Sequence, residues 1–230
     1  MIRRADQRGF SKNSWLESAF SFSFAEYYDP QNMGFGALRV INDDTIAPNS
    51  GFGMHPHRDM EIVTIVTDGK LSHQDSMGFT ESLDSTKVQY MSAGSGIKHS
   101  EMNNSNEPLE LFQIWIEPDA KGYEPRYKSI SITPDMYDKK LLKVAGGFGD
   151  ELIDIRQKAS LYRGRFEEGS KATVPHRQSG MGWYLFVISG EILVGGEHLT
   201  ARDAFMSAEE ENIDISFAKD SDILLFDVAL

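Results

Sequence analysis

Short apolar segments, each closed by glycine, proline or an acidic turn, recur along most of the chain. Residues 61–67 are rich in β-branched side chains and end at Asp68-Gly69, and residues 110–116 are strongly apolar and stop at Pro118. Segments of this length and spacing are typical of antiparallel strands, whereas βαβ units would need a helical pattern between them. The pattern predicts an all-β sandwich or barrel.

A polar connector at 121–134 divides the chain into two halves of similar character. Pro134 suits the first turn of a helix, so we expect the one helix of any length at 133–140. Strand-like segments resume beyond it, and 230 residues are enough for two small β domains. We expect two β-barrel domains, residues 1–130 and 131–230.

The two halves form a weak internal repeat. In each half a histidine-bearing turn precedes an apolar strand, and the strand ends at a glycine turn followed by further hairpins. In this alignment His55 corresponds to His176, and Gly69 corresponds to Gly190.

Charge and cysteine content exclude several classes of protein. The net charge is −12, whereas a nucleic-acid or anionic membrane surface requires a basic footprint. There is no cysteine, which excludes disulfides, thiolate catalysis and cysteine-ligated metals. No apolar run is long enough to span a membrane, and Met1 to Asp6 are not followed by the apolar stretch of a secretory signal. We therefore expect a cytoplasmic protein that binds neither membranes nor nucleic acid directly.

Aromatic residues gather within the first 30 positions. Phe20, Phe22 and Phe24 alternate with Ser21 and Ser23, which predicts a strand with one buried face. We expect these rings to pack in the core or to form a lid, with a wall for a flat aromatic ligand as the alternative.

Two short stretches place metal-binding side chains at i and i+2. His55-Pro56-His57 is the first, and His99-Ser100-Glu101 is the second. Side chains two apart on a strand share a face, so each stretch can present two donors to one ion. Glu61 continues the even spacing from His57, and on geometry alone either Glu61 or Glu101 could supply the carboxylate.

The sequence gives weaker evidence for a functional site at the other histidines. His73 and His198 are interpreted as ordinary polar residues near turns, with His73 a candidate for a pocket wall. His176 is followed by Gln178 in place of a second imidazole, and Gly182 stands where a motif glutamate would fall. We therefore expect the second barrel to carry no metal site.

Two further features have ordinary explanations. The glycine-rich segment 146–149 lacks the strand–helix context and the lysine of a phosphate-binding loop, and a turn is expected. Arg163 and Arg165 lie two apart on a predicted strand, where we expect a solvated face and not an anion site.

The spacing of the histidine stretches resembles the two signature motifs of the cupin superfamily. More closely, His55-Pro56-His57-Arg58 and the segment from Gln89 to Glu101 resemble the pirin family of bicupins over essentially the whole chain. Gly94 replaces the proline usual in the second motif. The resemblance implies two cupin barrels of jelly-roll type. It also implies a metal held in the first barrel by His55, His57, His99 and Glu101, with Glu61 a supporting or structural carboxylate.

Three imidazoles and one carboxylate suit a divalent transition metal. We expect Fe(II) first, with Ni, Cu, Mn, Co and Zn as alternatives. Four protein donors leave coordination positions for substrate and dioxygen, which favours a redox-active ion.

The resemblance implies a quercetin 2,3-dioxygenase-like oxidoreductase that opens a flavonol ring with O2. Glu101 would then also accept the proton of the flavonol hydroxyl. The alternative is a metal-dependent regulatory module that binds a protein partner, with incidental quercetinase activity. A weaker third hypothesis is an isomerase or hydrolase that uses the metal as a Lewis acid.

Overall fold

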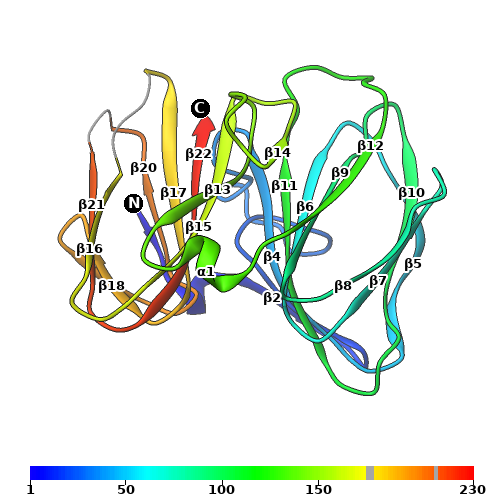
Figure 1. The fold of residues 1–230 in the computed structure, drawn as a ribbon, viewed down its shortest axis with the longest axis horizontal. Helices are drawn as coiled ribbons and strands as arrows, with labels where there is room; N and C mark the ends of the chain where they lie inside the picture. The colour runs from blue at the N-terminus through cyan, green and yellow to red at the C-terminus, as the bar shows by residue number, and fades with distance from the viewer. Residues whose placement is uncertain (175–178, 210–211) are drawn as a thin grey trace.

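The computed structural model describes residues 1–174, 179–209 and 212–230, and its regular structure is almost entirely β. Figure 1 shows two barrels side by side, the first built mainly from the blue-to-green half of the chain and the second mainly from the yellow-to-red half. Each barrel consists of one seven-stranded and one four-stranded sheet. The expected all-β bicupin architecture is confirmed.

The first barrel has a large sheet of order β12-β9-β6-β11-β4-β3-β2 and a small sheet of order β5-β10-β7-β8. Its pairings are antiparallel throughout, as the turn-rich sequence predicts. The strands are β2 (Gly9–Lys12), β3 (Leu16–Phe20), β4 (Leu38–Ile46), β5 (Ser50–His57), β6 (Glu61–Asp68), β7 (Leu71–Asp75), β8 (Thr80–Leu83), β9 (Lys87–Ser92), β10 (Ile97–Asn103), β11 (Leu109–Ile116) and β12 (Arg126–Ser131).

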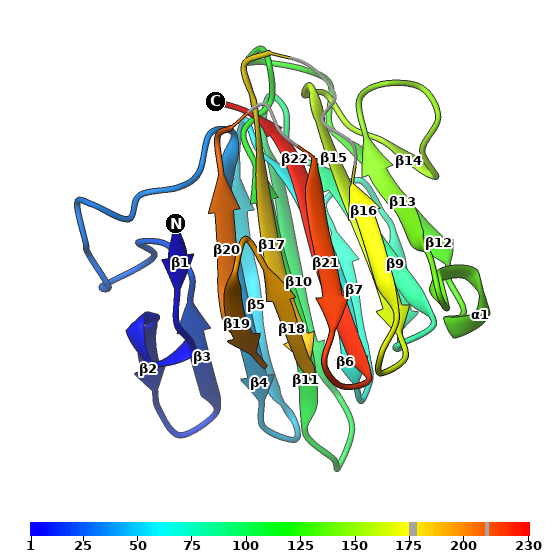
Figure 2. The same cartoon turned by 90° about the vertical axis from the view of Figure 1, so that its left-hand side faces the viewer.

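The second barrel repeats this plan, with a large sheet of order β1-β20-β17-β22-β15-β13-β14 and a small sheet of order β16-β21-β18-β19. Figure 2 shows the strands of its two sheets running in similar directions. The strands are β1 (Ile2–Arg3), β13 (Leu141–Gly146), β14 (Ile153–Asp154), β15 (Ala159–Phe166), β16 (Lys171–Val174), β17 (Met181–Ser189), β18 (Glu191–Val194), β19 (Glu197–Thr200), β20 (Ala204–Ser207), β21 (Ile213–Phe217) and β22 (Ser221–Ala229).

The large sheets of the two barrels face each other across a shared apolar core. Phe112 and Ile114 of β11 belong to the same buried cluster as Tyr184 and Phe186 of β17, and the rings of Phe112 and Phe186 lie 5.5 Å apart. Residues 61–66 of β6 are buried on both faces, because one face lines the barrel and the other meets the second domain. Burial on both faces explains why these strands read as continuous apolar runs without alternation.

The glycine turns predicted at Gly69 and Gly190 connect equivalent strands. They join β6 to β7 and β17 to β18, with positive φ angles of 78° and 90°. A Cβ at Gly69 would lie 2.5 Å from the carbonyl oxygen of Pro108, and one at Gly190 would lie 2.2 Å from that of Asp220. These positions therefore require glycine on both conformational and steric grounds.

The first strand of the chain belongs to the second barrel. Ile2 in β1 pairs with Phe205 in β20, and the amino group of Met1 donates to the carbonyl of Met206 at 2.8 Å. A 3₁₀ turn at Ala5–Gln7 then leads across to β2 in the first barrel.

Two local predictions are wrong in extent. The helix expected at 133–140 is only α1 (Pro134–Tyr137), because Asp138 leaves helical geometry and Lys139 has a φ of 58°. The alternation of Phe20, Phe22 and Phe24 is not one strand: β3 ends at Phe20 and the chain turns into the domain interface. Ser21 and Ser23 are accordingly buried as well.

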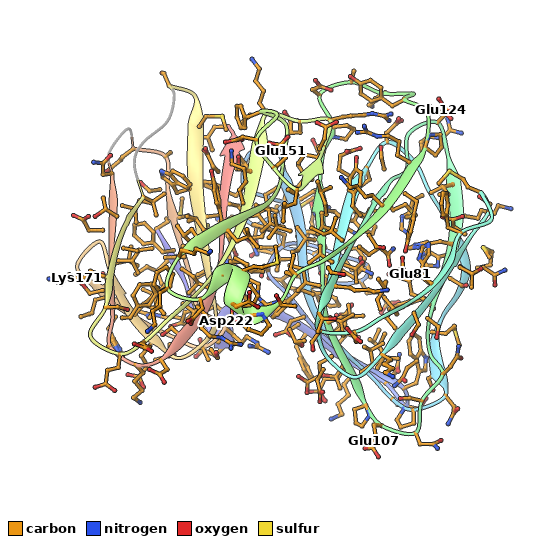
Figure 3. The ribbon with its side chains drawn as sticks, in the orientation of Figure 1. Glu81, Glu107, Glu124, Glu151, Lys171 and Asp222 are labelled. Carbon is orange, nitrogen blue, oxygen red and sulfur yellow. The ribbon has the colours of Figure 1, made fainter. Side chains whose placement is uncertain are left out.

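Arg163 does not lie on a solvated face. It is buried, its guanidinium lies 2.8 Å from Asp222 and 4.5 Å from the ring centre of Tyr137 in α1, and Figure 3 shows Asp222 close to that helix. Arg165 is about half exposed, as expected. Gly146 ends β13 and residues 147–149 bend away from it, in agreement with the expected turn.

No helix in the described part of the chain is both long and apolar enough to cross a membrane.

Candidate metal centre

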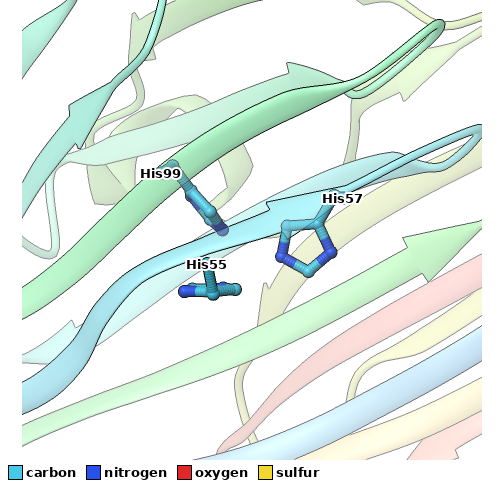
Figure 4. Close-up of side chains that lie close together, drawn as sticks. All are labelled: His55, His57 and His99. Atoms are coloured by element: carbon cyan, nitrogen blue, oxygen red, sulfur yellow. The ribbon is translucent and has the colours of Figure 1, made fainter.

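Three histidines meet on the inner face of the small sheet of the first barrel. His55 and His57 lie on β5, and strand register places His99 of β10 directly opposite His55. One ring nitrogen of each lies within 4.8 Å of the others, and the ring centres are 4.4–4.8 Å apart. Figure 4 shows the three rings converging on one region between the strands. The predicted same-face geometry of His55 and His57 is therefore present.

Burial favours the neutral form of His57 and His99, which is the form that can bind a metal ion. His99 is buried, and neither of its ring nitrogens has a hydrogen-bond partner among the described residues. Burial and the neighbouring histidines lower the pKa of His99 to about 2 and that of His57 to about 4. Nδ1 of His55 lies 2.8 Å from the carbonyl oxygen of Gly53, which fixes a tautomer with Nε2 free as an acceptor. This donor set fits a divalent transition metal.

Glu101 lies deeper in the barrel, beyond a break in the register of β10 that follows His99. Its carboxylate, with His99 and His73, forms a second group of donors within 4.8 Å of one another. The two groups share His99. Burial raises the pKa of Glu101 to about 7, against hydrogen bonds from Gln113 and Thr64 that lower it.

Glu61 faces away from this centre. The chain turns between β5 and β6, where Asp59 has a φ of 49°, so the even spacing from His57 does not preserve a face. The carboxylate of Glu61 instead accepts hydrogen bonds from Tyr90 and Ser92, both at 2.5 Å, and from the backbone N–H of Arg156 at 3.0 Å. The inference that either glutamate could reach the histidines is wrong, because Glu61 points into the domain interface.

His73, expected to be an ordinary polar residue near a turn or part of a pocket wall, is buried inside the first barrel beside His99 and Glu101. It is buried on β7 opposite Glu101, with its ring stacked 4.9 Å from that of Tyr127. Nδ1 accepts from the Gln89 side-chain amide at 3.1 Å, and Nε2 faces Asp75 at 3.5 Å. The period-two pattern of His73 and Asp75 after a glycine turn was the available signal that both side chains point inward.

Aromatic side chains flank the histidines. Trp115 of β11 meets His57 edge-on with ring centres 5.0 Å apart, and Phe24 in turn contacts Trp115 at 5.3 Å. Phe52 lies 6.1 Å from His55 and 5.0 Å from Trp15. Rings of the N-terminal segment thus pack behind Trp115 and Phe52, the two rings that contact the histidines. The sequence predicts Trp115 only as part of an apolar strand.

In the described part of the second barrel, apolar side chains stand where the first barrel has His55 and His99. Val174 lies opposite Ile213 on the strands equivalent to β5 and β10, so strand register aligns Val174, and not His176, with His55. His176 and Gln178 lie outside the described residues. His198 is half exposed and pairs with Glu191 at 3.1 Å.

Two cupin barrels in one chain, with a three-histidine cluster inside the first, define the bicupin class of metal-binding proteins. A family model described as Pirin matches residues 2–116, and one described as Quercetinase C-terminal cupin domain matches residues 144–228. The chain therefore belongs to the pirin family.

The similarity of this chain to known proteins extends over nearly its whole length. It is 41% identical to a quercetin 2,3-dioxygenase of Escherichia coli K12, covering 99% of this chain and 97% of that one. It is also 41% identical to a pirin-like protein of Caulobacter vibrioides, covering 97% of each chain. The crystal structure of the bacterial pirin YhhW from E. coli in complex with nickel(II) superposes with a TM-score of 0.93 at 38% identity, covering 100% of this chain and 98% of that one. Family and cluster together support a metal-dependent cupin function.

Proposed function

We propose that this protein is a metal-dependent dioxygenase of quercetin 2,3-dioxygenase type, which opens a flavonol ring with O2. The observation that carries the proposal is the convergence of three imidazoles beside the aromatic rings of Trp115 and Phe52. The name of the E. coli relative supplies the substrate class.

In this proposal His55, His57, His99 and Glu101 hold one divalent metal. Fe(II) is our first assignment, and the nickel complex of the E. coli pirin makes Ni(II) the main alternative. A bound metal of this kind supplies a redox-active centre with open positions for substrate and O2.

The residues of the chain contribute positioning and proton transfer. Nε2 of His55 is kept free by the bond from Nδ1 to Gly53, and the buried ring of His99 is held neutral. The carboxylate of Glu101 accepts the proton of the substrate hydroxyl. Trp115 and Phe52 pack beside a flat aromatic substrate and exclude water from it.

The test is an oxygen-dependence assay. Metal content is first measured on protein purified without added metal. The protein is then loaded with Fe(II), Ni(II), Mn(II), Co(II), Cu(II) or Zn(II), and loss of quercetin absorbance is followed with and without O2. We expect O2-dependent loss with at least one redox-active metal, and none in a His55→Ala/His57→Ala variant. Absence of O2-dependent turnover with every metal contradicts the proposal, and equal turnover with zinc under nitrogen indicates Lewis-acid chemistry instead.

A further inference from the structure

The carboxylate of Glu101 is held by one side chain from the opposite sheet. The amide nitrogen of Gln113 on β11 lies 2.7 Å from Oε1 and 2.6 Å from Oε2 of Glu101. The hydroxyl of Thr64 on β6 is a more distant donor, 3.5 Å from Oε1. Glu101 and Gln113 are both buried, so water does not substitute readily for this contact.

The second barrel shows what the same positions contain without a donor cluster. Thr64 and Leu185 each lie five residues before the equivalent turn glycines, Gly69 and Gly190. Strand register pairs Thr64 with Gln113 in the first barrel and Leu185 with Leu225 in the second. Gln113 therefore corresponds to Leu225.

The same reasoning extends to the rest of the interior. His73 and Val194 each lie four residues after the turn glycine, and they pair with Glu101 and Ile215 respectively. Six polar residues of the first interior have apolar counterparts in the second: Thr64, Gln89, Gln113, His73, His99 and Glu101 correspond to Leu185, Phe205, Leu225, Val194, Ile213 and Ile215.

This barrel architecture does not require a buried amide at the position of Gln113. Burying an amide costs free energy unless its hydrogen bonds are made, and leucine fills the equivalent position with no such cost. The amide of Gln113 is thus explained by its bond to Glu101 and not by packing.

We propose that Gln113 is a positioning residue of the metal centre: its amide fixes the orientation of the Glu101 carboxylate and thereby sets how tightly the centre holds a divalent metal. The inference rests on the ligand set of the proposed function. Hydrogen-bond partners of metal ligands typically change metal affinity by about 10–100-fold when they are removed.

The experiment is a double-mutant cycle read by cobalt(II) binding. Dissociation constants and the visible absorption bands of bound Co(II) are measured for wild type, Gln113→Leu, Glu101→Gln and the double variant. We expect Gln113→Leu to weaken binding by about 10–100-fold and to alter the absorption bands. In the Glu101→Gln background we expect the same substitution to change affinity by less than about twofold, because Gln113 acts through Glu101.

Asn42 provides the matched control. It is buried on β4, directly opposite Gln113 in strand register, and it is not among the hydrogen-bond donors to Glu101. Asn42→Leu is expected to keep the wild-type affinity and spectrum. Gln113→Met, closer in length to glutamine, repeats the test with a smaller packing change, and circular dichroism checks that each variant is folded.

The outcomes separate this inference from the proposed function. Wild type that fails to bind Co(II) overturns both. Wild type that binds, with Gln113→Leu and Gln113→Met unchanged or tighter, overturns the positioning role alone. If Gln113→Leu lowers Co(II) affinity equally in the wild-type and Glu101→Gln backgrounds, the positioning role is also overturned, because the effect would then be structural.

Discussion

Three buried carboxylates of the first barrel, Asp44, Glu61 and Glu101, have different surroundings. Glu61 faces the domain interface, where Tyr90, Ser92 and the backbone of Arg156 supply its hydrogen bonds. Glu101 faces the histidines, and Asp44 lies in the interior with Ser18 as its partner. Carboxylates of one chemical type therefore have different partners: Glu61 projects toward the domain interface, whereas Asp44 and Glu101 project into the barrel interior.

Glu61→Gln tests the assignment of Glu61 to the interface. The amide keeps the shape but replaces one acceptor oxygen with a donor, which leaves at least one buried bond unmade. We expect the free energy of unfolding to fall by about 1–3 kcal/mol while Co(II) affinity stays at the wild-type value. Urea denaturation and metal titration measure the two effects, and a tenfold loss of affinity would show that Glu61 acts on the metal centre.

Asp44 makes stability depend on pH. Burial raises the pKa of Asp44 to about 7 from a value near 4 in the unfolded chain. A raised pKa in the folded state contributes stability that is fully present below pH 4 and is lost as the pH rises through 7.

We therefore expect Asp44→Asn to gain stability over wild type as the pH rises from 4 to 8, by up to about 4 kcal/mol. Denaturation curves across this range measure the difference. A flat difference for Asp44→Asn would contradict the assignment.

For single residues, the sequence predicts the arrangement of the histidines well, because side chains two apart on a strand point to the same face. It does not predict Gln113, Trp115 or the inward role of His73, since their contacts depend on register between strands distant in the chain. The wrong inference that Glu61 could reach the histidines has the same origin: a turn at Asp59 interrupts the period.

Among the structural elements, the turns between equivalent strands are sterically constrained. At Gly69 a methyl group would meet the carbonyl of Pro108, whereas at Gly78, with a φ of 95°, a methyl group would meet nothing within 4 Å.

We expect Gly78→Ala to cost about 1 kcal/mol through backbone strain alone. Gly69→Ala should cost at least about 2 kcal/mol, because the clash adds to the strain. Chemical denaturation measures both, and equal costs would argue against the clash.

Strand positions were predictable from apolar runs and turn residues, and most predicted strands are present. The helix was predicted too long because polar residues after Pro134 carry no signal that distinguishes a single turn from two. Arg163 was misplaced because its partners, Asp222 and Tyr137, come from strand pairing and from α1, which period alone does not reveal. The division of the chain near residue 130 stays a prediction.

For the whole molecule, the shared core between the large sheets implies a single unfolding transition. Trp15 and Trp115 lie in the first barrel and Trp183 lies in the second. A Trp183→Phe variant therefore reports the first barrel by fluorescence, and a Trp15→Phe/Trp115→Phe variant reports the second. Relative to its own circular dichroism curve, we expect each variant to show a coincident fluorescence midpoint. Midpoints that separate within a variant would show that the barrels unfold independently.

The pairing of β1 with β20 has a consequence for the order of events during synthesis. Residues 2 and 3 pair with residues 204 and 205, so the chain must be synthesised at least to residue 205 before this edge of the second sheet can close. The N-terminal barrel can begin to form earlier, but the segment that precedes it stays unpaired until β20 has been synthesised. Contacts of such long sequence separation are slow to form. We therefore expect closure of the β1–β20 edge to be a late step in folding.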